Sequence, residues 1–270
     1  MRPGMLSLVI AVIIAALACE DNAHVVKRKI RELWRKTKFT QGADMFSGFN
    51  AGGIIGRHAF SVVPDPAGGP DQVLRVFFPN GSYSRASPVG VVQFYAWPTG
   101  PQSALMFSYD VYFSNDFDFV RGGKLPGLWG GRTNTCSALR RAVGCFSTRF
   151  MWRSFGAGEV YAYLPEKSAW SLGRGKWYFR KGQWQNIAQY IHLNTPGSKD
   201  GYIKVFMNRE QVFNVTDVTF RTDYTVNISG IFFSTFFGGK DPYWAATRDS
   251  YIYFKNFVLS TGDEAPLILS

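Results

Sequence analysis

The chain has 270 residues, of which 46% are hydrophobic and 17% aromatic, and it contains 28 glycines and 13 prolines. This composition argues against a disordered chain and favours one large β domain with many turns. The formal net charge of +11 indicates a polyanionic partner, which charge alone leaves open among nucleic acid, an anionic membrane and an acidic polysaccharide.

Residues 1–19 have the features of a secretory signal peptide. Arg2 precedes an apolar run from Met5 to Cys19 that ends among small residues. The run is shorter than the roughly 20 residues that a membrane span needs. We therefore expect a secreted, extracellular protein without stable membrane insertion; a membrane anchor and a lipoprotein modified at Cys19 are the alternatives.

Removal of the signal leaves two cysteines, Cys136 and Cys145. An even pair in an oxidising compartment predicts a disulfide that closes a short loop. Three sequons, at Asn80, Asn214 and Asn227, predict N-glycosylation of a secreted protein.

Residues 20–39 form a basic N-terminal arm. Lys and Arg dominate residues 25–38, where Ile30, Leu33 and Trp34 recur at helical spacing. This pattern predicts a short amphipathic basic helix. Such a helix can serve as a surface for an anionic polymer or membrane, or as a solvated cap over one edge of the domain.

Short strands separated by Gly/Pro turns follow from residue 39 onward. The expected strands are 59–63, 72–78, 90–95, 104–113, 145–152, 159–164, 183–193, 202–207, 230–237 and 250–259. This spacing predicts an all-β, antiparallel β-sandwich of jelly-roll type. We expect one domain over residues 40–262, a C-terminal tail over 263–270, and a monomer.

Strand alternation brings polar residues to a common face within residues 121–163. In the stretch CFSTRFMW, Ser147 and Arg149 point the same way, and in EVYAYL so do Tyr161 and Tyr163. The glycines of residues 153–158 predict a hairpin loop between the two strands. The two polar faces are therefore expected to lie side by side along one groove.

These residue types suit β-elimination on an acidic sugar. That reaction needs a cation to neutralise the carboxylate and acidify the C5 proton, a base for that proton, and an acid for the leaving O4 oxygen. Arg149 can grip a carboxylate with two hydrogen bonds, Lys124 adds a point charge, and Ser147 can position the substrate. Tyrosines can act as base and acid when cations lie nearby. In mannuronate and glucuronate H5 and O4 lie on the same side of the ring, so one tyrosine can do both.

The same stretch resembles polysaccharide lyase family 14, which contains secreted and viral alginate and glucuronan lyases. The resemblance rests on GGKLPGL at residues 122–128, on Ser147-Thr148-Arg149 and on Tyr161-Ala162-Tyr163, and weaker similarity extends over most of residues 50–260. It implies a β-jelly roll, catalytic roles for Lys124 and for the Ser, Arg and Tyr residues of these motifs, an acidic polysaccharide substrate, and no metal or other cofactor. The isolated histidines of the chain also give a poor ligand set.

Four further residues are candidates for sugar subsites. Gln189 lies on an expected strand, and Lys240, Tyr243 and Trp244 follow a Gly-Gly turn. The alternative for Tyr243 and Trp244 is that they cap an edge of the sandwich.

Two other functions fit parts of the sequence. A glycoside hydrolase needs paired carboxylates, and the nearest pair, Asp116 and Asp118, lacks a third acid and lies in an expected turn. A secreted lectin-like module that binds acidic glycans without cleaving them would share the same fold, charge and aromatic residues. The signal peptide and the disulfide argue against a nucleic-acid partner.

Overall fold

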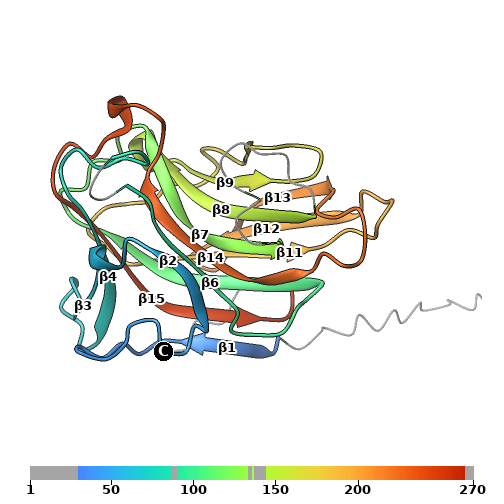
Figure 1. Ribbon diagram of the computed structural model, residues 1–270, viewed down its shortest axis with the longest axis horizontal. Coiled ribbons are helices and arrows are strands. Elements are labelled where there is room, and N and C mark those ends of the chain that lie inside the picture. The colour runs from blue at the N-terminus through green and yellow to red at the C-terminus, as the bar shows by residue number, and fades with distance from the viewer. Residues whose placement is uncertain (1–29, 87–89, 133–135, 137–143, 265–270) are drawn as a thin grey trace, which may run out of the picture.

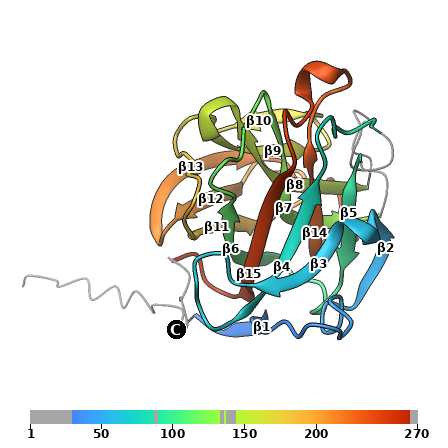
Figure 2. The ribbon, with the colours of Figure 1, turned by 90° about the vertical axis from the view of Figure 1, so that its left-hand side faces the viewer.

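The computed structural model describes residues 30–86, 90–132, 136 and 144–264, in which the chain forms two antiparallel β-sheets packed face to face (Figure 1, Figure 2). The prediction of an all-β antiparallel sandwich is confirmed. Among the described residues, no helix has the length and apolar character needed to cross a bilayer. The predicted signal peptide (1–19), the arm as far as residue 29 and the tail after residue 264 lie outside the described residues.

The first sheet has the order β13-β12-β11-β6-β15-β4-β3, and β1 also pairs with β15. Its strands are β1 (Glu32–Lys36), β3 (Phe60–Pro64), β4 (Gln72–Phe78), β6 (Ala104–Phe113), β11 (Gln185–His192), β12 (Gly201–Met207), β13 (Glu210–Val218) and β15 (Ser250–Ser260). The second sheet has the order β10-β9-β8-β7-β14-β5-β2. Its strands are β2 (Ala51–Ile55), β5 (Val92–Ala96), β7 (Gly122–Gly131), β8 (Cys145–Arg153), β9 (Gly158–Tyr163), β10 (Trp170–Leu172) and β14 (Ile228–Phe237).

The core between the sheets is rich in phenylalanine. Phe94 and Phe233 of the second sheet stack with ring centroids 4.7 Å apart, and Phe233 meets Phe254 of the first sheet at 5.0 Å. Such aromatic pairs add to the stabilisation from burial itself. Because one face of each strand supplies this core, the alternate residues of the second sheet lie on its outer face.

The predicted N-terminal helix is wrong for the part of the arm that the structure describes. Residues Glu32–Lys36 form strand β1, which pairs with the end of β15 beyond the point where β4 stops. The ring of Trp34 packs against Phe49 at 5.3 Å, and its indole N–H donates to the carbonyl oxygen of Gly48 at 2.9 Å. Tertiary packing and an available strand edge therefore outweigh helical periodicity in this segment.

All ten predicted strands are confirmed, with ends shifted by up to two residues, and β1, β2, β7, β10 and β13 were missed. β7 was missed because its sequence, GGKLPGLWGG, has the composition of a loop. Pro126 sits at an irregularity of the β7–β8 register, where no ladder hydrogen bond is needed. A Cβ atom at position 123 would collide with the Trp152 ring, and a Cβ atom at position 127 would collide with the backbone of Thr148, so both positions are glycine.

Candidate active site

Three neighbouring strands of the second sheet, β7, β8 and β9, bring the predicted catalytic residues together. Arg149 on β8 lies opposite Tyr161 on β9, and Lys124 on β7 lies opposite Met151 on β8. Residues 154–156 form a short 3-10 turn within the β8–β9 connection, as expected for a hairpin. The predicted common polar face is therefore present.

A cavity of about 510 Å³ opens on this face. Four of the five predicted catalytic residues line it: Lys124, Arg149, Tyr161 and Tyr163. The other described lining residues are Ser84, Arg85, Val91, Gln93, Phe236, Gly238, Gly239 and Lys240. Among the described lining residues four side chains are cationic and none is a carboxylate, which makes the cavity a site for an anion.

Lys124 is buried at the floor of the cavity. Its Nζ lies 3.6 Å from the centre of the Tyr161 ring and 2.7 Å from the sulfur of Met151, which is a weak acceptor. Burial, and then the positive charges of Arg149 and Arg153, hold the pKa of Lys124 well below its usual value. An incoming carboxylate would favour the charged form of this amine.

Arg149 is 3% exposed, and its guanidinium group is held from two sides. One Nη donates to the hydroxyl of Ser234 at 3.1 Å, and the group lies 4.6 Å from the centre of the Phe232 ring. Its Nε has no hydrogen-bond partner. A buried cation with an unused donor is prepared to bind an anion, since an unsatisfied buried donor is costly.

Tyr161 and Tyr163 meet edge to face, with ring centroids 5.5 Å apart. Burial, and then the neighbouring Tyr163, raise the pKa of Tyr161 to about 12. The guanidinium group of Arg149 lies 5.6 Å from the centre of the Tyr163 ring and interacts electrostatically with this phenol. Each phenol thus lies beside a basic side chain, Tyr161 beside Lys124 and Tyr163 beside Arg149, and the raised pKa keeps Tyr161 protonated.

A fully buried carboxylate, Glu159, supports this arrangement from β9. It forms ion pairs of 2.6 Å with Arg153 and Arg174, and it accepts a hydrogen bond from Ser171 at 2.5 Å. Burial opposes its ionisation, but the hydrogen bonds from Arg153 and Ser171 bring the pKa of Glu159 below its usual value. Glu159 therefore holds Arg153 close to the Tyr161 ring, at 5.8 Å.

Ser147, the fifth predicted catalytic residue, does not line the cavity. It is 1% exposed, and its hydroxyl donates to the carbonyl oxygen of Cys136 at 2.8 Å. The predicted disulfide between Cys136 and Cys145 is present, and the two cysteines pack in one cluster with Tyr163. Ser147 thus ties the disulfide to β8 in this structure, and a direct part in the reaction stays a prediction.

Removal of the disulfide by Cys136→Ser/Cys145→Ser is expected to lower kcat about tenfold, because Tyr163 loses its packing partner and a small displacement of a reacting group is costly. The closed loop spans 9 residues in sequence, so stability should fall by about 2–3 kcal/mol. Steady-state kinetics and thermal unfolding measure the two effects. An unchanged kcat in the double variant would contradict a positioning role of the disulfide for Tyr163.

The four predicted subsite residues lie in different places. Lys240 lines the cavity. Gln189 does not reach it, because its side chain is fully buried between the sheets and donates to the carbonyl oxygen of Thr148 at 2.8 Å. Tyr243 is 74% exposed beside Arg121 and outside the cavity lining, and Trp244 packs beside Arg153 at 5.8 Å.

Sequence reasoning missed three residues of the site. Gln93 on β5 and Arg85 line the cavity, and Ser234 on β14 holds Arg149. Gln93 and Ser234 lie opposite each other in the β5–β14 pair. Gln93 stands among apolar and aromatic residues in VQFYA, and Ser234 follows two phenylalanines in ISGIFFSTFF; that contrast was the available signal.

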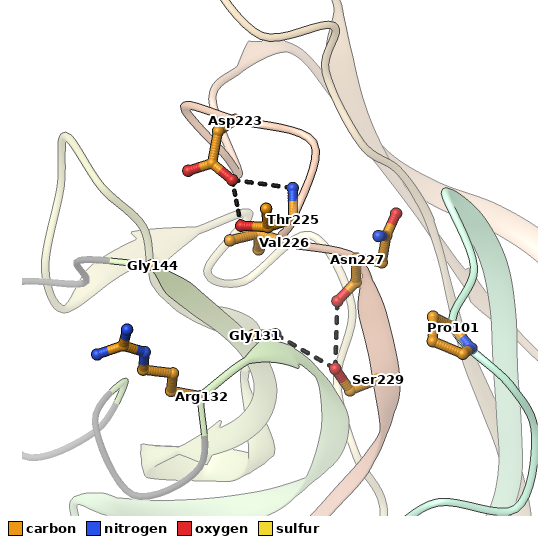
Figure 3. Close-up of a pocket in the computed structure, with 9 residues that line it drawn as sticks. All are labelled: Pro101, Gly131, Arg132, Gly144, Asp223, Thr225, Val226, Asn227 and Ser229. Atoms are coloured by element: carbon orange, nitrogen blue, oxygen red, sulfur yellow. Dashed lines mark hydrogen bonds between the residues drawn. The ribbon is translucent and has the colours of Figure 1, made fainter.

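A second cavity, of about 440 Å³, lies where β7 ends and β14 begins, at the ends of these strands away from the catalytic cavity (Figure 3). The hydroxyl of Ser229 accepts a hydrogen bond from the N–H of Gly131 and donates to the carbonyl oxygen of Asn227. The carboxylate of Asp223 accepts hydrogen bonds from the N–H and hydroxyl of Thr225. These polar groups already have hydrogen-bond partners within the protein, and the described lining of the cavity contains none of the predicted catalytic residues.

The predicted sequons differ in exposure. Asn80 and Asn214 are exposed. Asn227 is half-buried, and its amide donates to the carbonyl oxygen of Tyr224 and accepts from Arg221. Glycosylation of all three stays a prediction.

Within the described part of the chain, no three His, Cys, Asp or Glu side chains are grouped so as to hold a metal ion. The family model for polysaccharide lyase 14 matches residues 67–257, which include every residue of the site. The chain belongs to polysaccharide lyase family 14. No curated protein sequence matches this lyase.

Three solved structures illustrate how the lyase relates to others. The marine PL-14 alginate lyase from Aplysia kurodai is 32% identical, with a TM-score of 0.78 over 86% of this chain and 100% of the other. Alginate lyase vAL-1 from a Chlorella virus is 23% identical, with a TM-score of 0.70 over 80% and 93%. The endo-β-1,4-glucuronan lyase from the fungus Trichoderma reesei is 9% identical, with a TM-score of 0.58 over 86% and 96%. The last two share the fold alone.

Proposed function

We propose that this lyase is secreted and cleaves a polyuronate by β-elimination at the cavity of β7, β8 and β9. The observation that carries the proposal is the meeting of two buried cations, Lys124 and Arg149, with two tyrosines in contact, Tyr161 and Tyr163. Residues 1–19 and the disulfide support secretion.

Substrate binding begins with the carboxylate of the sugar to be cleaved. Arg149 binds this group through its unused donor, and Lys124 adds positive charge from the cavity floor. Both are in place before the reaction and shielded from water, so they stabilise the negative charge that develops as the C5 proton leaves. Arg85 and Lys240 at the cavity wall suit the carboxylates of adjacent sugars.

Proton transfer follows from the different surroundings of the two phenols. Tyr163, which lies beside the guanidinium group of Arg149, takes the proton from C5. Tyr161, kept protonated by a pKa of about 12, gives its proton to O4. The C5–H and C4–O4 bonds break and a C4–C5 double bond forms. The products are a shortened chain with a free hydroxyl and an unsaturated uronate end.

Alginate rich in mannuronate is the substrate that we propose first. The alginate lyase from Aplysia kurodai aligns along its whole length with 86% of this chain. In mannuronate the C5 proton and the O4 leaving group lie on the same side of the sugar ring, which also fits two tyrosines on a single strand, β9. Glucuronan, with the same relation between H5 and O4, is the second candidate substrate.

An assay of the mature protein against polymannuronate, polyguluronate and glucuronan tests the proposal. Elimination creates an unsaturated uronate that absorbs in the ultraviolet, whereas hydrolysis creates reducing ends without that absorbance. We expect ultraviolet absorbance to rise on polymannuronate, and to stay flat for a Lys124→Met variant. Binding of all three polymers with no product from any would replace the proposal with a lectin-like function.

A further inference from the structure

An exposed aromatic residue, Phe155, lies at the tip of the β8–β9 hairpin, outside the catalytic cavity. Its side chain is 91% exposed, and its backbone is in the left-handed region, with φ 60° and ψ 17°. Glycine or asparagine adopts this conformation at lower cost than a bulky residue. Folding stability therefore does not account for phenylalanine here, and such outliers concentrate at functional positions.

The backbone around Phe155 is firmly held. Gly156 accepts a hydrogen bond from the N–H of Phe179 at 2.7 Å, and the hydroxyl of Ser154 donates to the carbonyl oxygen of Val120 at 2.7 Å. Gly156 is also packed against the ring of Phe119. The exposed ring is thus presented at a defined place, which lowers the entropy cost of binding a ligand.

Two cationic side chains line the same cavity as the Phe155 ring. Lys181 and Arg248 line with Phe155 a cavity of about 580 Å³. Two carboxylates, Asp116 and Asp118, also line it, but both oxygens of Asp118 are occupied, one by the N–H of Val120 and one by the hydroxyl of Thr247. The two cations and two carboxylates of this cavity balance in charge, and the excess of positive charge near the hairpin comes from the exposed Arg174 and Lys176.

The segment after β10 links this region to the catalytic cavity. Tyr178, 54% exposed, forms a β-bridge with Ala157, two residues from Phe155, and its hydroxyl lies over Gly175. The exposed Lys176 lies in the same turn. Arg174 joins the segment to the site through its 2.6 Å ion pair with Glu159, two residues before Tyr161.

We propose that a surface beside the hairpin binds uronate residues of the same polymer chain, beyond those held in the cavity. We name it the hairpin patch, and it consists of Phe155, Arg174, Lys176, Tyr178, Lys181 and Arg248. Its aromatic rings pack on the C–H face of a sugar, and its cations pair with carboxylates. Charge complementarity, and the ion pair that joins Arg174 to Glu159 on the catalytic strand β9, favour the polymer as occupant. The inference rests on the proposed function.

Kinetics on substrates of two lengths test the hairpin patch. The variant Phe155→Gly/Lys176→Gln/Lys181→Gln is compared with a control of the same kind, Ile55→Ala/Lys199→Gln/Arg209→Gln, which removes one exposed apolar side chain and two cations elsewhere. We expect the patch variant to raise KM on long polymannuronate about tenfold without changing kcat, since each weak surface contact contributes little alone. Kinetics on a uronate trisaccharide should not change, and the control should match wild type on both substrates.

Two further measurements keep the inference open to disproof. The Tm of the patch variant should equal or exceed that of wild type, because glycine relieves the left-handed backbone; an equal KM on the polymer in this folded variant would overturn the inference. Affinity electrophoresis in polymannuronate, with Lys124→Met in both backgrounds, measures binding without turnover. If wild type cleaves no polyuronate, the proposed function fails. Electrophoresis then tests the hairpin patch by itself, because polymannuronate should retard the migration of the protein with the intact patch and should no longer retard the patch variant.

Discussion

Tyr163→Phe is expected to lower kcat on polymannuronate by about 10²- to 10⁴-fold, the usual contribution of a general base, with little change in KM. The loss follows from the removal of the proton-accepting hydroxyl, while the ring beside Arg149 and its packing against the disulfide stay. Initial rates of ultraviolet absorbance measure it. Thermal unfolding should match wild type, which separates lost chemistry from lost structure.

Tyr161→Phe should lower kcat by a comparable factor on the natural polymer but behave differently on an activated substrate. When a short uronide carries an acidic phenol as the leaving group at C4, departure no longer needs a proton donor. The Tyr161 variant should then recover most of its rate, whereas the Tyr163 variant should not. Recovery by Tyr163→Phe alone would reverse the two roles, and recovery by neither would assign both proton transfers to one tyrosine.

Lys124→Met is expected to abolish elimination, with kcat lower by at least about 10²-fold, and to stabilise the fold. Wild type buries an amine against Arg149 and Arg153, whereas methionine fills a similar volume without charge. Replacing buried charged groups by apolar side chains stabilises proteins by about 1 to 4 kcal/mol. Denaturant unfolding at neutral pH measures the gain; a less stable variant would show that Lys124 supports the fold.

The stability gain in Lys124→Met should depend on pH in a definite direction. The folded-state pKa of Lys124 is lowered, so between that value and the unfolded value near 10.5 the unfolded chain binds more protons. Wild-type stability therefore rises with pH across this window. The advantage of the variant should be largest below the folded-state pKa and vanish above 10.5. A constant advantage at all pH values would mean that packing, and not charge, causes it.

Alternation along single strands was the part of the site that the sequence could predict. Alternation along each strand puts Arg149 on one strand, and Tyr161 and Tyr163 on the next, on the same face of the sheet. A short hairpin joins the two strands, so local geometry alone places these residues together. The disulfide was likewise predictable, because it closes a short loop next to that hairpin. In each case the interacting residues are near one another in the chain.

The remaining errors arise from contacts between distant segments. Gln189 was assigned to the groove because a polar residue on a strand suggests exposure, yet it satisfies the backbone of Thr148 across the core. Gln93 and Ser234 were missed because only the pairing of β5 with β14 brings them to Arg149. The helix expected around Trp34 became a strand because β15 offers an edge there. A pattern within one segment contains none of this information.

The tight packing of β7 constrains how this enzyme can diversify. At Gly123, Gly127 and Gly130 even one added methyl group would collide with a neighbouring strand, so substitution there threatens the sheet itself. The side chains of Arg85 and Lys240 in the cavity wall come instead from connections between strands. We therefore expect enzymes of this fold that evolve to cleave a different polymer to differ in the sequences of these connections and to keep the same reacting groups.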